Sequence, residues 1–343
     1  MNEVQVIGSH NSYKLAIDGP LLDLLKAFSQ DAQALDYAHV PLTEQLDMGV
    51  RGLELDLYHD PDGGRYAKPL GLEMVRRLGK TPDPFDEGPM LRPGFKVLHV
   101  SDIDFRSNQP TLAGCLAELR RWSEAHRGHL PIVVTMNLKT DPAPVPGAVK
   151  PLPFDRDALN RLDAELIEGL GRDRLITPDL VRGDAETLNR AVLERGWPTL
   201  GDLADRFLFA MDEGGEKRRE YLRGHASLRE RVMFTTPSPG EDDAAVLVMN
   251  DPLKDGPRIA ELVQAGYLVR TRADAGTSEA RAGDRRRLDA ALASGANIVS
   301  TDYYLKDTRF GTNYEVRLPN GAVCRERPGL RVPTTQAAEE TNP

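Results

Sequence analysis

Short apolar runs recur along the chain and alternate with longer segments in which apolar residues return at helical spacing. The runs that predict strands are residues 4–8, 51–57, 95–100, 131–138, 206–211, 231–236, 267–272 and 297–301. The clearest helical segments are residues 111–126, 156–171 and 283–295. Alternation of this kind is typical of α/β proteins with a mainly parallel sheet. Eight strands interleaved with helices predict a single (β/α)8 TIM barrel.

Two Pro- and Gly-rich stretches interrupt this alternation, at residues 58–94 and 141–153. They follow the second and fourth predicted strands, so we expect long loops at the C-terminal face, where barrel active sites are built. We predict that the barrel domain covers residues 1–315. Residues 316–343 are predicted to form a C-terminal extension whose polar tail, from about residue 331, is partly disordered.

Composition excludes several classes of protein. Hydrophobic residues make up 40% and charged residues 28% of the 343 residues, which is typical of a globular chain. The formal net charge of -9 argues against a nucleic-acid partner, since such binding needs a basic surface. No apolar run reaches the length of a membrane span, and no signal peptide precedes the first strand. Cys115 and Cys324 fit no metal spacing, and two free thiols are favoured over the alternative of one disulfide.

Polar side chains gather where the predicted strands end. In "LELDL", residues 53–57, Glu54 and Asp56 share one strand face because side chains alternate between the two faces. Inside a barrel these two carboxylates repel each other unless a positive charge compensates, and a hard cation bound through oxygen suits that position. The alternative is an amphipathic edge strand whose polar face is solvated.

Two histidines and two arginines occupy similar positions. His10 follows the first strand and His99 ends the third, so the two imidazoles are candidates for proton donor and acceptor in one pocket. Arg270 and Arg272 alternate with apolar neighbours on a strand that reads as buried. Guanidinium groups there predict phosphate binding, although an ion pair with Asp274 or Asp302 explains at least one of them equally well.

Several motifs together resemble one family. They are "GSHNSY" (8–13), "GVRGLELDLYHDPDGG" (49–64), "FKVLHVSDIDFRS" (95–107), "MNLKTD" (136–141), "GYLVRTRAD" (266–274) and "ALASGANIVSTDYY" (291–304). In this order they resemble the bacterial calcium-dependent phosphoinositide phospholipases C, which are TIM-barrel phosphodiesterases acting on phospholipid head groups. The resemblance runs from about residue 4 to residue 305.

The resemblance implies a site and a reaction. His10 and His99 are the implied catalytic histidines, and Glu54 or Asp56 is a plausible general base. The implied Ca2+ ligands are Asn11, Glu54, Asp56 and a residue at the end of strand four. That fourth ligand is often Glu in better-known members, whereas this chain has Asn137, whose amide oxygen carries no charge. A hydroxyl of the head group attacks phosphorus, and diacylglycerol leaves with formation of a cyclic inositol phosphate.

The resemblance also leads to expectations about the substrate pocket and the setting. Lys139, Arg270 and Arg272 are predicted to line the head-group pocket. Tyr303 and Tyr304 are expected either to stack on an inositol ring or to pack at the barrel rim. The implied partners are a phospholipid substrate and, transiently, a membrane surface, and no protein partner is inferred. Secretion is the family habit, but the sequence shows no signal peptide, so a cytoplasmic location stays open.

Three other functions compete with this interpretation. A glycerophosphodiester phosphodiesterase or a phospholipase D of the same barrel class uses a similar histidine pair and cation. An amidohydrolase-type metal hydrolase commonly needs His-x-His after strand one, where this chain has "SHNS". A catalytically inert binding barrel is the third alternative, and Asn137 is the residue that favours it.

Overall fold

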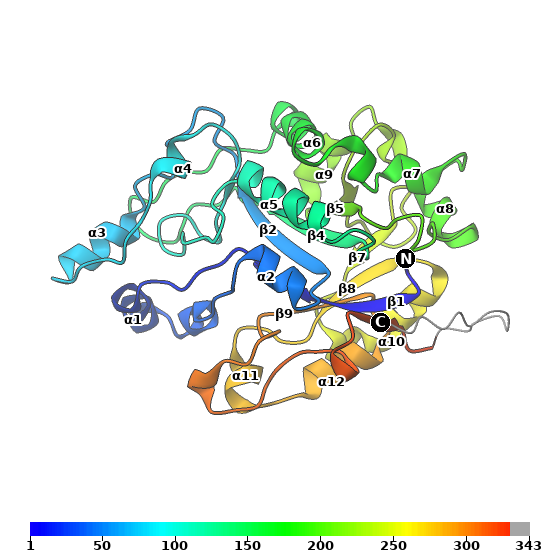
Figure 1. Ribbon diagram of the computed structural model, residues 1–343. Helices are drawn as coiled ribbons and strands as arrows, with labels where there is room; N and C mark the ends of the chain where they lie inside the picture. Colours follow the sequence, from blue (N-terminus) through cyan, green and yellow to red (C-terminus); the bar gives the residue numbers. More distant parts are fainter. Residues whose placement is uncertain (330–343) are drawn as a thin grey trace.

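Eight parallel strands form a nearly closed barrel in the computed structural model, which describes residues 1–329 (Figure 1). Hydrogen-bonded neighbours follow the order β6-β5-β4-β2-β1-β9-β8-β7. The strands are β1 (Val4–Ser9), β2 (Gly52–Tyr58), β4 (Ile132–Leu138), β5 (Phe207–Met211), β6 (Phe234–Thr235), β7 (Val246–Val248), β8 (Leu268–Arg272) and β9 (Ile298–Thr301). The predicted TIM-barrel class is therefore confirmed.

Helices connect the strands and cover the outside of the barrel (Figure 1). The α-helices are α1 (Gly19–Phe28), α2 (Leu42–Asp47), α3 (Leu70–Arg77), α4 (Gly88–Leu91), α5 (Leu112–Ala125), α6 (Arg156–Leu170), α7 (Pro178–Arg182), α8 (Leu188–Glu194), α9 (Gly215–Leu222), α10 (Pro252–Ala265), α11 (Ser278–Ala282) and α12 (Arg286–Ala293). Two of the long ones, α5 and α6, begin at side-chain caps. Thr111 accepts a hydrogen bond from the Gly114 amide at the start of α5, and Asp155 accepts one from Ala158 at the start of α6.

One predicted strand was wrong, and one barrel strand was missed. The run 95–100 is not a barrel strand, because only β3 (Lys96–Val97) pairs, antiparallel to the end of β2, and the chain then turns back at Val100 and Asp104. The eighth barrel strand is instead β7, which the sequence analysis missed. Three residues of β7 give too short an apolar run to stand out, and its pairing with β8 is a tertiary contact that local pattern does not encode.

The backbones of β1 and β2 approach each other closely just before the polar residues that follow β1. Gly8 lies opposite Gly52, and a Cβ added at Gly52 would lie 2.7 Å from the Ile298 side chain and 3.1 Å from the Gly8 Cα atom. Glycine at both positions lets the two backbones meet. Just beyond β1, Asn11 has a φ of 47°, a left-handed conformation that Asn tolerates better than most residues. This turn carries the chain across the mouth of the barrel directly after His10.

The connection after β1 joins the long connections predicted after strands two and four in a lobe at the C-terminal end of the barrel. The lobe contains α1, α3 and α4 and lies to the left in Figure 1. It has its own apolar cluster, which includes Leu21, Val75, Ile103 and Phe105. The chain that follows β1 and the chain that follows β2 thus pack against each other, which fixes the rim around the barrel mouth.

The segment after residue 315 returns to the barrel. Strand β10 (Cys324–Glu326) pairs antiparallel with β1, and Val316 and Leu318 belong to the main core. The boundary at residue 315 stays a prediction, and the polar tail predicted from about residue 331 lies outside the described residues. Cys115 is buried and Cys324 is half-buried, and both are free thiols as expected. None of the described helices is long and apolar enough to cross a membrane.

Candidate active site

A polar cavity of about 210 Å³ opens at the C-terminal end of the barrel strands. Its lining comes from β2, β4, β8 and the segments that follow β1, β3, β4, β5 and β7. The lining residues are His10, Asn11, Glu54, Asp56, His99, Asn137, Lys139, Asp212, Asn250, Arg270 and Arg272. Hollows of about 560 and 530 Å³ exist elsewhere on the described chain, but neither contains both histidines. We therefore place the candidate site in the smaller cavity, where the predicted polar residues meet.

Glu54 and Asp56 face the cavity together, as their alternation on β2 predicted. Both are buried, and Asp56 lies opposite Asn137 in the register of β2 and β4. The Asn137 amide donates to Glu54 Oε1 at 2.9 Å and to Asp56 Oδ1 at 3.1 Å. The carboxylate pair is thus bridged by an amide from the neighbouring strand.

Two cations of the chain balance these carboxylates. Arg270 donates to Glu54 Oε2, and Lys139 Nζ lies 2.8 Å from Asp56 Oδ2. Burial raises the pKa of Glu54, but the charges of Arg270 and His10 outweigh it and leave that pKa below its ordinary value. Burial likewise lowers the pKa of Lys139, and Asp56 more than offsets it, so Lys139 holds its proton firmly. The sequence analysis did not foresee either ion pair.

His10 is fixed through both ring nitrogens. Its Nδ1 lies 2.8 Å from Asp302 Oδ1, and its Nε2 lies 3.1 Å from an Arg272 nitrogen. Because guanidinium can only donate, Nε2 accepts and the proton of the neutral ring sits on Nδ1, facing Asp302. Arg272 also binds Asp302 at 2.9 Å, which is one of the ion pairs that the sequence left open. Burial raises the pKa of Asp302, but His10 and Arg272 hold it well below its ordinary value.

His99 has an equivalent partner. Its Nδ1 lies 2.7 Å from Asp104 Oδ2, and the turn after β3 brings the two residues together. The sequence analysis missed Asp104. Its only signal is the "HVSDID" stretch, in which it follows His99 by five residues. Each histidine therefore has Nδ1 on a buried carboxylate, while Nε2 lies at the cavity, where that of His10 accepts from Arg272.

The two tyrosines expected to stack on the substrate do not lie at this cavity. Tyr303 and Tyr304 are 2% and 4% exposed. Tyr304 stacks on His39 with ring centroids 5.2 Å apart, while Tyr303 packs edge-on against Phe310 and Tyr314. Both rings are part of the packing next to Asp302. Their positions agree with the alternative of packing at the rim and do not fit a role in stacking on the substrate.

Asp212 and Asn250 are lining residues that were not among the predicted site residues. Asp212 follows β5, and Thr236 donates to its Oδ1 at 3.1 Å. Burial raises the pKa of Asp212, and the nearby charge of Arg270 only partly opposes this. Asp212 thus adds an acidic group to the cavity that takes a proton more readily than an exposed aspartate.

The oxygen atoms of this cavity fit a hard cation. Glu54, Asp56, Asn11 and Asn137 would each bind it through a carboxylate or amide oxygen, the ligand type that calcium prefers. Asp56 Oδ2 is buried and receives no well-directed hydrogen bond, although the Lys139 ammonium lies close to it. Within residues 1–329, no group of three or more His, Cys, Asp or Glu side chains is placed to hold a metal ion. A cation here must therefore rely on amide oxygens in addition to two carboxylates.

The family of the chain follows from comparison with known proteins. Residues 1–328 match the profile of the family described as phosphoinositide phospholipase C, Ca2+-dependent. The chain belongs to this family. The resemblance inferred from the motifs is therefore confirmed over the length of the barrel.

Solved structures of phosphoinositide phospholipases C share the fold. One is a calcium-dependent phosphoinositol-specific phospholipase C from a Pseudomonas species, described as an apo form and myoinositol complex. It is 17% identical, with a TM-score of 0.54 over 95% of this chain and 94% of the other. Another is a Ca2+-dependent phosphatidylinositol-specific phospholipase C from Streptomyces antibioticus. It is 19% identical, with a TM-score of 0.54 over 88% of this chain and 94% of the other. No curated protein sequence matches the chain.

Proposed function

We propose that this member of the phosphoinositide phospholipase C family cleaves the phosphodiester of phosphatidylinositol-type lipids. The observation that carries the proposal is the pair of histidines at one cavity, each held at Nδ1 by a buried carboxylate at 2.7 to 2.8 Å. Such an arrangement presents two Nε2 atoms to one phosphodiester, with three positively charged side chains, Lys139, Arg270 and Arg272, for its oxygens. A binding barrel has no need of two oriented imidazoles.

The proposed reaction moves one proton from the attacking hydroxyl to a base and one proton from an acid to the leaving group. A hydroxyl of the head group attacks phosphorus, and Glu54 or Asp56 accepts its proton. The bond from phosphorus to the diacylglycerol oxygen breaks, and His99 gives that oxygen a proton. His10 stabilises the charged phosphoryl group by a hydrogen bond from a protonated Nε2, so a phosphoryl oxygen replaces Arg272 as the partner of that nitrogen. The products are diacylglycerol and a cyclic inositol phosphate.

The positively charged side chains of the cavity and the proposed calcium ligands have separate roles. Lys139, Arg270 and Arg272 provide positive charge for the phosphate and the head group. Asn11, Glu54, Asp56 and Asn137 would hold Ca2+, which when bound supplies charge neutralisation to the phosphoryl oxygens. Lys139 and Arg270 already neutralise the two carboxylates, so we expect weaker calcium affinity than in a site with three carboxylates.

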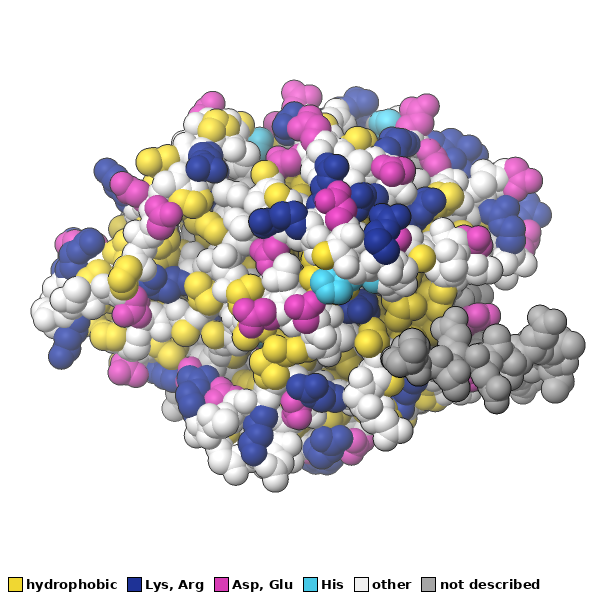
Figure 2. All heavy atoms as spheres, in the orientation of Figure 1, with side chains coloured by type: hydrophobic (Ala, Val, Ile, Leu, Met, Phe, Trp, Pro, Cys, Tyr) yellow, Lys and Arg dark blue, Asp and Glu magenta, His cyan; other side chains and the backbone are white. Residues whose placement is uncertain are grey.

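A membrane surface is the proposed place of encounter with the substrate. Phe28, Leu78 and Leu91 are 81%, 44% and 54% exposed, and they lie at the ends of α1, α3 and α4 in the lobe above the barrel mouth. Hydrophobic side chains are visible on this lobe, at the left of Figure 2. Exposed apolar side chains near an entrance suit shallow, reversible contact with lipid.

The proposed function predicts a specific product. Phosphatidylinositol in vesicles and water-soluble glycerophosphoinositol are incubated with the protein, with calcium and with excess chelator, and the products are identified by phosphorus NMR. We expect a cyclic inositol phosphate from both substrates, more rapidly from vesicles, with calcium raising the rate. Phosphatidic acid would indicate a phospholipase D, and glycerol phosphate a glycerophosphodiester phosphodiesterase. The double variant His10→Ala/His99→Ala is the control for contaminating activity.

Asn137→Glu tests whether calcium binds at the carboxylate pair. The Asn137 amide donates to both Glu54 and Asp56, so a glutamate there loses two hydrogen bonds and adds a third negative charge. We expect tighter calcium binding by titration calorimetry and, without calcium, a lower melting temperature. Asn137→Gln, which adds no charge, is the matched control. Unchanged or weaker calcium binding by Asn137→Glu would remove residue 137 from the ligand set.

A further inference from the structure

A fully buried lysine lies behind the candidate site. Lys14 has no exposed surface, and its ammonium contacts Asp104 Oδ1 at 3.2 Å. It also donates to the carbonyl oxygens of Leu35 at 2.9 Å and Tyr37 at 3.0 Å. Burial of an ammonium carries a large desolvation cost unless the group is paired in this way. No step of the proposed reaction uses Lys14, so its place beside the site calls for another explanation.

Lys14 and His99 share one carboxylate. Asp104 offers Oδ1 to Lys14 and Oδ2 to the Nδ1 of His99, and Asp104 itself is 1% exposed. The hydroxyls of Tyr13 and Tyr37 also lie near Asp104. Burial raises the pKa of Asp104, but Lys14 and then His99 bring it below its ordinary value. Without the ammonium, the imidazole would be the only cation available to a buried carboxylate.

The same ammonium also supports the other histidine. Lys14 Nζ lies 4.7 Å from the centre of the Tyr37 ring, and the Tyr37 hydroxyl lies 3.4 Å from His10 Nδ1. Its hydrogen bonds to the carbonyls of Leu35 and Tyr37 hold this segment in place. Lys14 therefore contacts the support of each histidine while it stays outside the cavity.

We propose that Lys14 is a positioning residue for His99, whose buried ammonium keeps Asp104 charged and oriented so that His99 presents Nε2 to the cavity as an acid. This inference rests on the proposed function, because it concerns the residue assigned to protonate the leaving group. Lys14 also takes up part of the negative charge of Asp104. Asp104 is thereby held from one side by Lys14 and from the other by the His99 ring.

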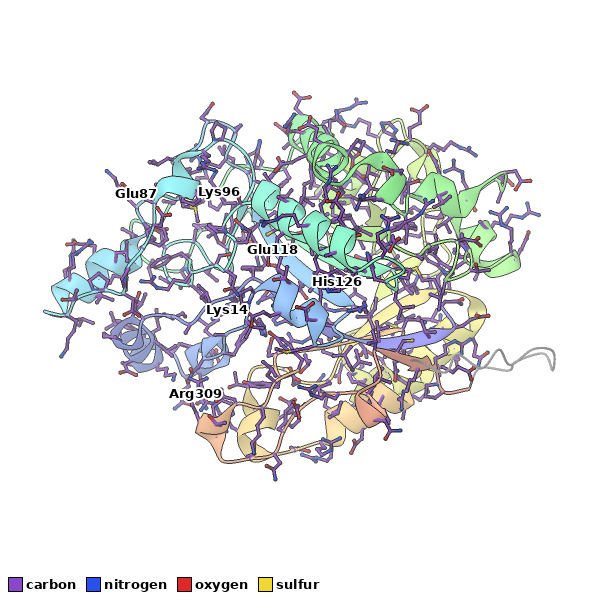
Figure 3. All side chains as sticks on the ribbon, in the orientation of Figure 1. Lys14, Glu87, Lys96, Glu118, His126 and Arg309 are labelled. Carbon is purple, nitrogen blue, oxygen red and sulfur yellow. The ribbon has the colours of Figure 1, made fainter. Side chains whose placement is uncertain are left out.

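The test compares Lys14→Met with a matched variant of a second buried lysine. Lys96 is also fully buried, and its ammonium lies 3.2 Å from the buried Asp60. Figure 3 labels both residues, with Lys96 near α4 and Lys14 near α2. Lys96→Met therefore removes a similar ion pair that has no histidine attached. A purely structural role for Lys14 predicts that the two variants behave alike.

Two measurements separate the roles. In Lys14→Met, loss of the positive charge should move the NMR titration midpoint of the His99 ring up by about one pH unit. Cleavage of phosphatidylinositol should fall by about 10- to 100-fold, as is common when the partner of a working histidine is disturbed, while cleavage of a nitrophenyl inositol phosphate falls much less. Lys96→Met should lower the melting temperature and leave both readouts unchanged. Equal behaviour of the two variants would overturn the proposal.

A double variant covers the case in which Lys14→Met does not fold. Lys14→Met/Asp104→Asn removes both charges, and it is compared with Asp104→Asn alone. If Lys14 acts through Asp104, the two should show the same ratio of lipid to nitrophenyl cleavage. A further fall in that ratio for the double variant would contradict the proposal. If the wild-type protein cleaves neither substrate, the proposed function fails. The NMR titration of His99 in Lys14→Met and Lys96→Met still tests whether Lys14 acts on His99.

Discussion

His99→Ala is expected to slow cleavage of phosphatidylinositol by about 10²- to 10⁴-fold, the usual loss when a positioned proton donor is removed. The leaving alkoxide of diacylglycerol is strongly basic and needs a proton as it departs. A nitrophenolate leaves without one, so cleavage of a nitrophenyl inositol phosphate should be affected far less. The measurement is the ratio of the two losses in rate. The melting temperature of the variant is measured as well, to confirm that the protein is folded under the assay conditions.

His10→Ala is the matched comparison, because its ring is anchored in the same way by Asp302. It should slow both substrates by similar factors, since negative charge develops on the phosphoryl group in either reaction. If His99→Ala slows both substrates equally and His10→Ala spares the nitrophenyl compound, the two roles must be exchanged. If neither variant discriminates, no general acid has been identified in this cavity.

Arg270→Met is expected to lower the free energy of unfolding by about 3–5 kcal/mol, the range observed when one partner of a buried ion pair is removed. Arg270 and Glu54 are only 3% and 4% exposed at their side chains, so solvent screens the pair little. The variant leaves a buried carboxylate without its guanidinium. Urea unfolding at pH 7 measures the loss.

The pH dependence of this loss has a definite sign. In the wild-type protein the pKa of Glu54 is lowered, so the stability that this group contributes is present at neutral pH and disappears as the pH falls through that pKa. In the variant, burial is no longer opposed by Arg270, and Glu54 should become protonated and neutral at a higher pH. The difference in stability between the two proteins should therefore shrink as the pH falls from 7 towards 4.

Three controls accompany Arg270→Met. Adding Glu54→Gln removes the uncompensated charge and should restore most of the stability. Arg190→Met breaks an exposed pair with Glu194 and should have no measurable effect. Calcium should raise the melting temperature of Arg270→Met more than that of the wild type if Glu54 is a calcium ligand. A variant as stable as the wild type would show that the Arg270–Glu54 pair contributes little.

Strand alternation and strand ends predicted much of the candidate site. Glu54 and Asp56 share a face because the period of a strand is two residues, and Asn137 meets Asp56 because parallel strands bring their C-terminal ends to one edge. His10, Asn11, Lys139, Arg270 and Arg272 also reach the same cavity. The positions of these residues follow from strand periodicity and from the barrel class. Their roles stay proposals.

The pairings inside the site were less accessible to sequence reasoning. Asp302 binds His10 across 292 positions of the chain, and Arg270 binds Glu54 across 216. Tyr303 and Tyr304 follow β9 directly, as site residues often do, but their rings turn into the packing around His39 and Tyr314. Local sequence gave no sign of that rotation, because side-chain direction beyond a strand end depends on what packs there.

The sequence by itself determined the barrel class, the family and the chemical types at the strand ends, since periodicity and motif order are properties of the chain alone. Only the tertiary structure showed that the segment after β3 turns back, that β7 completes the barrel, and which carboxylate serves which cation. The physical reason is how far apart in the sequence the interacting residues lie. Hydrophobic periodicity is set by neighbours a few residues apart, whereas the orientation of His99 depends on a buried lysine 85 residues earlier, brought against Asp104 only by the folded chain.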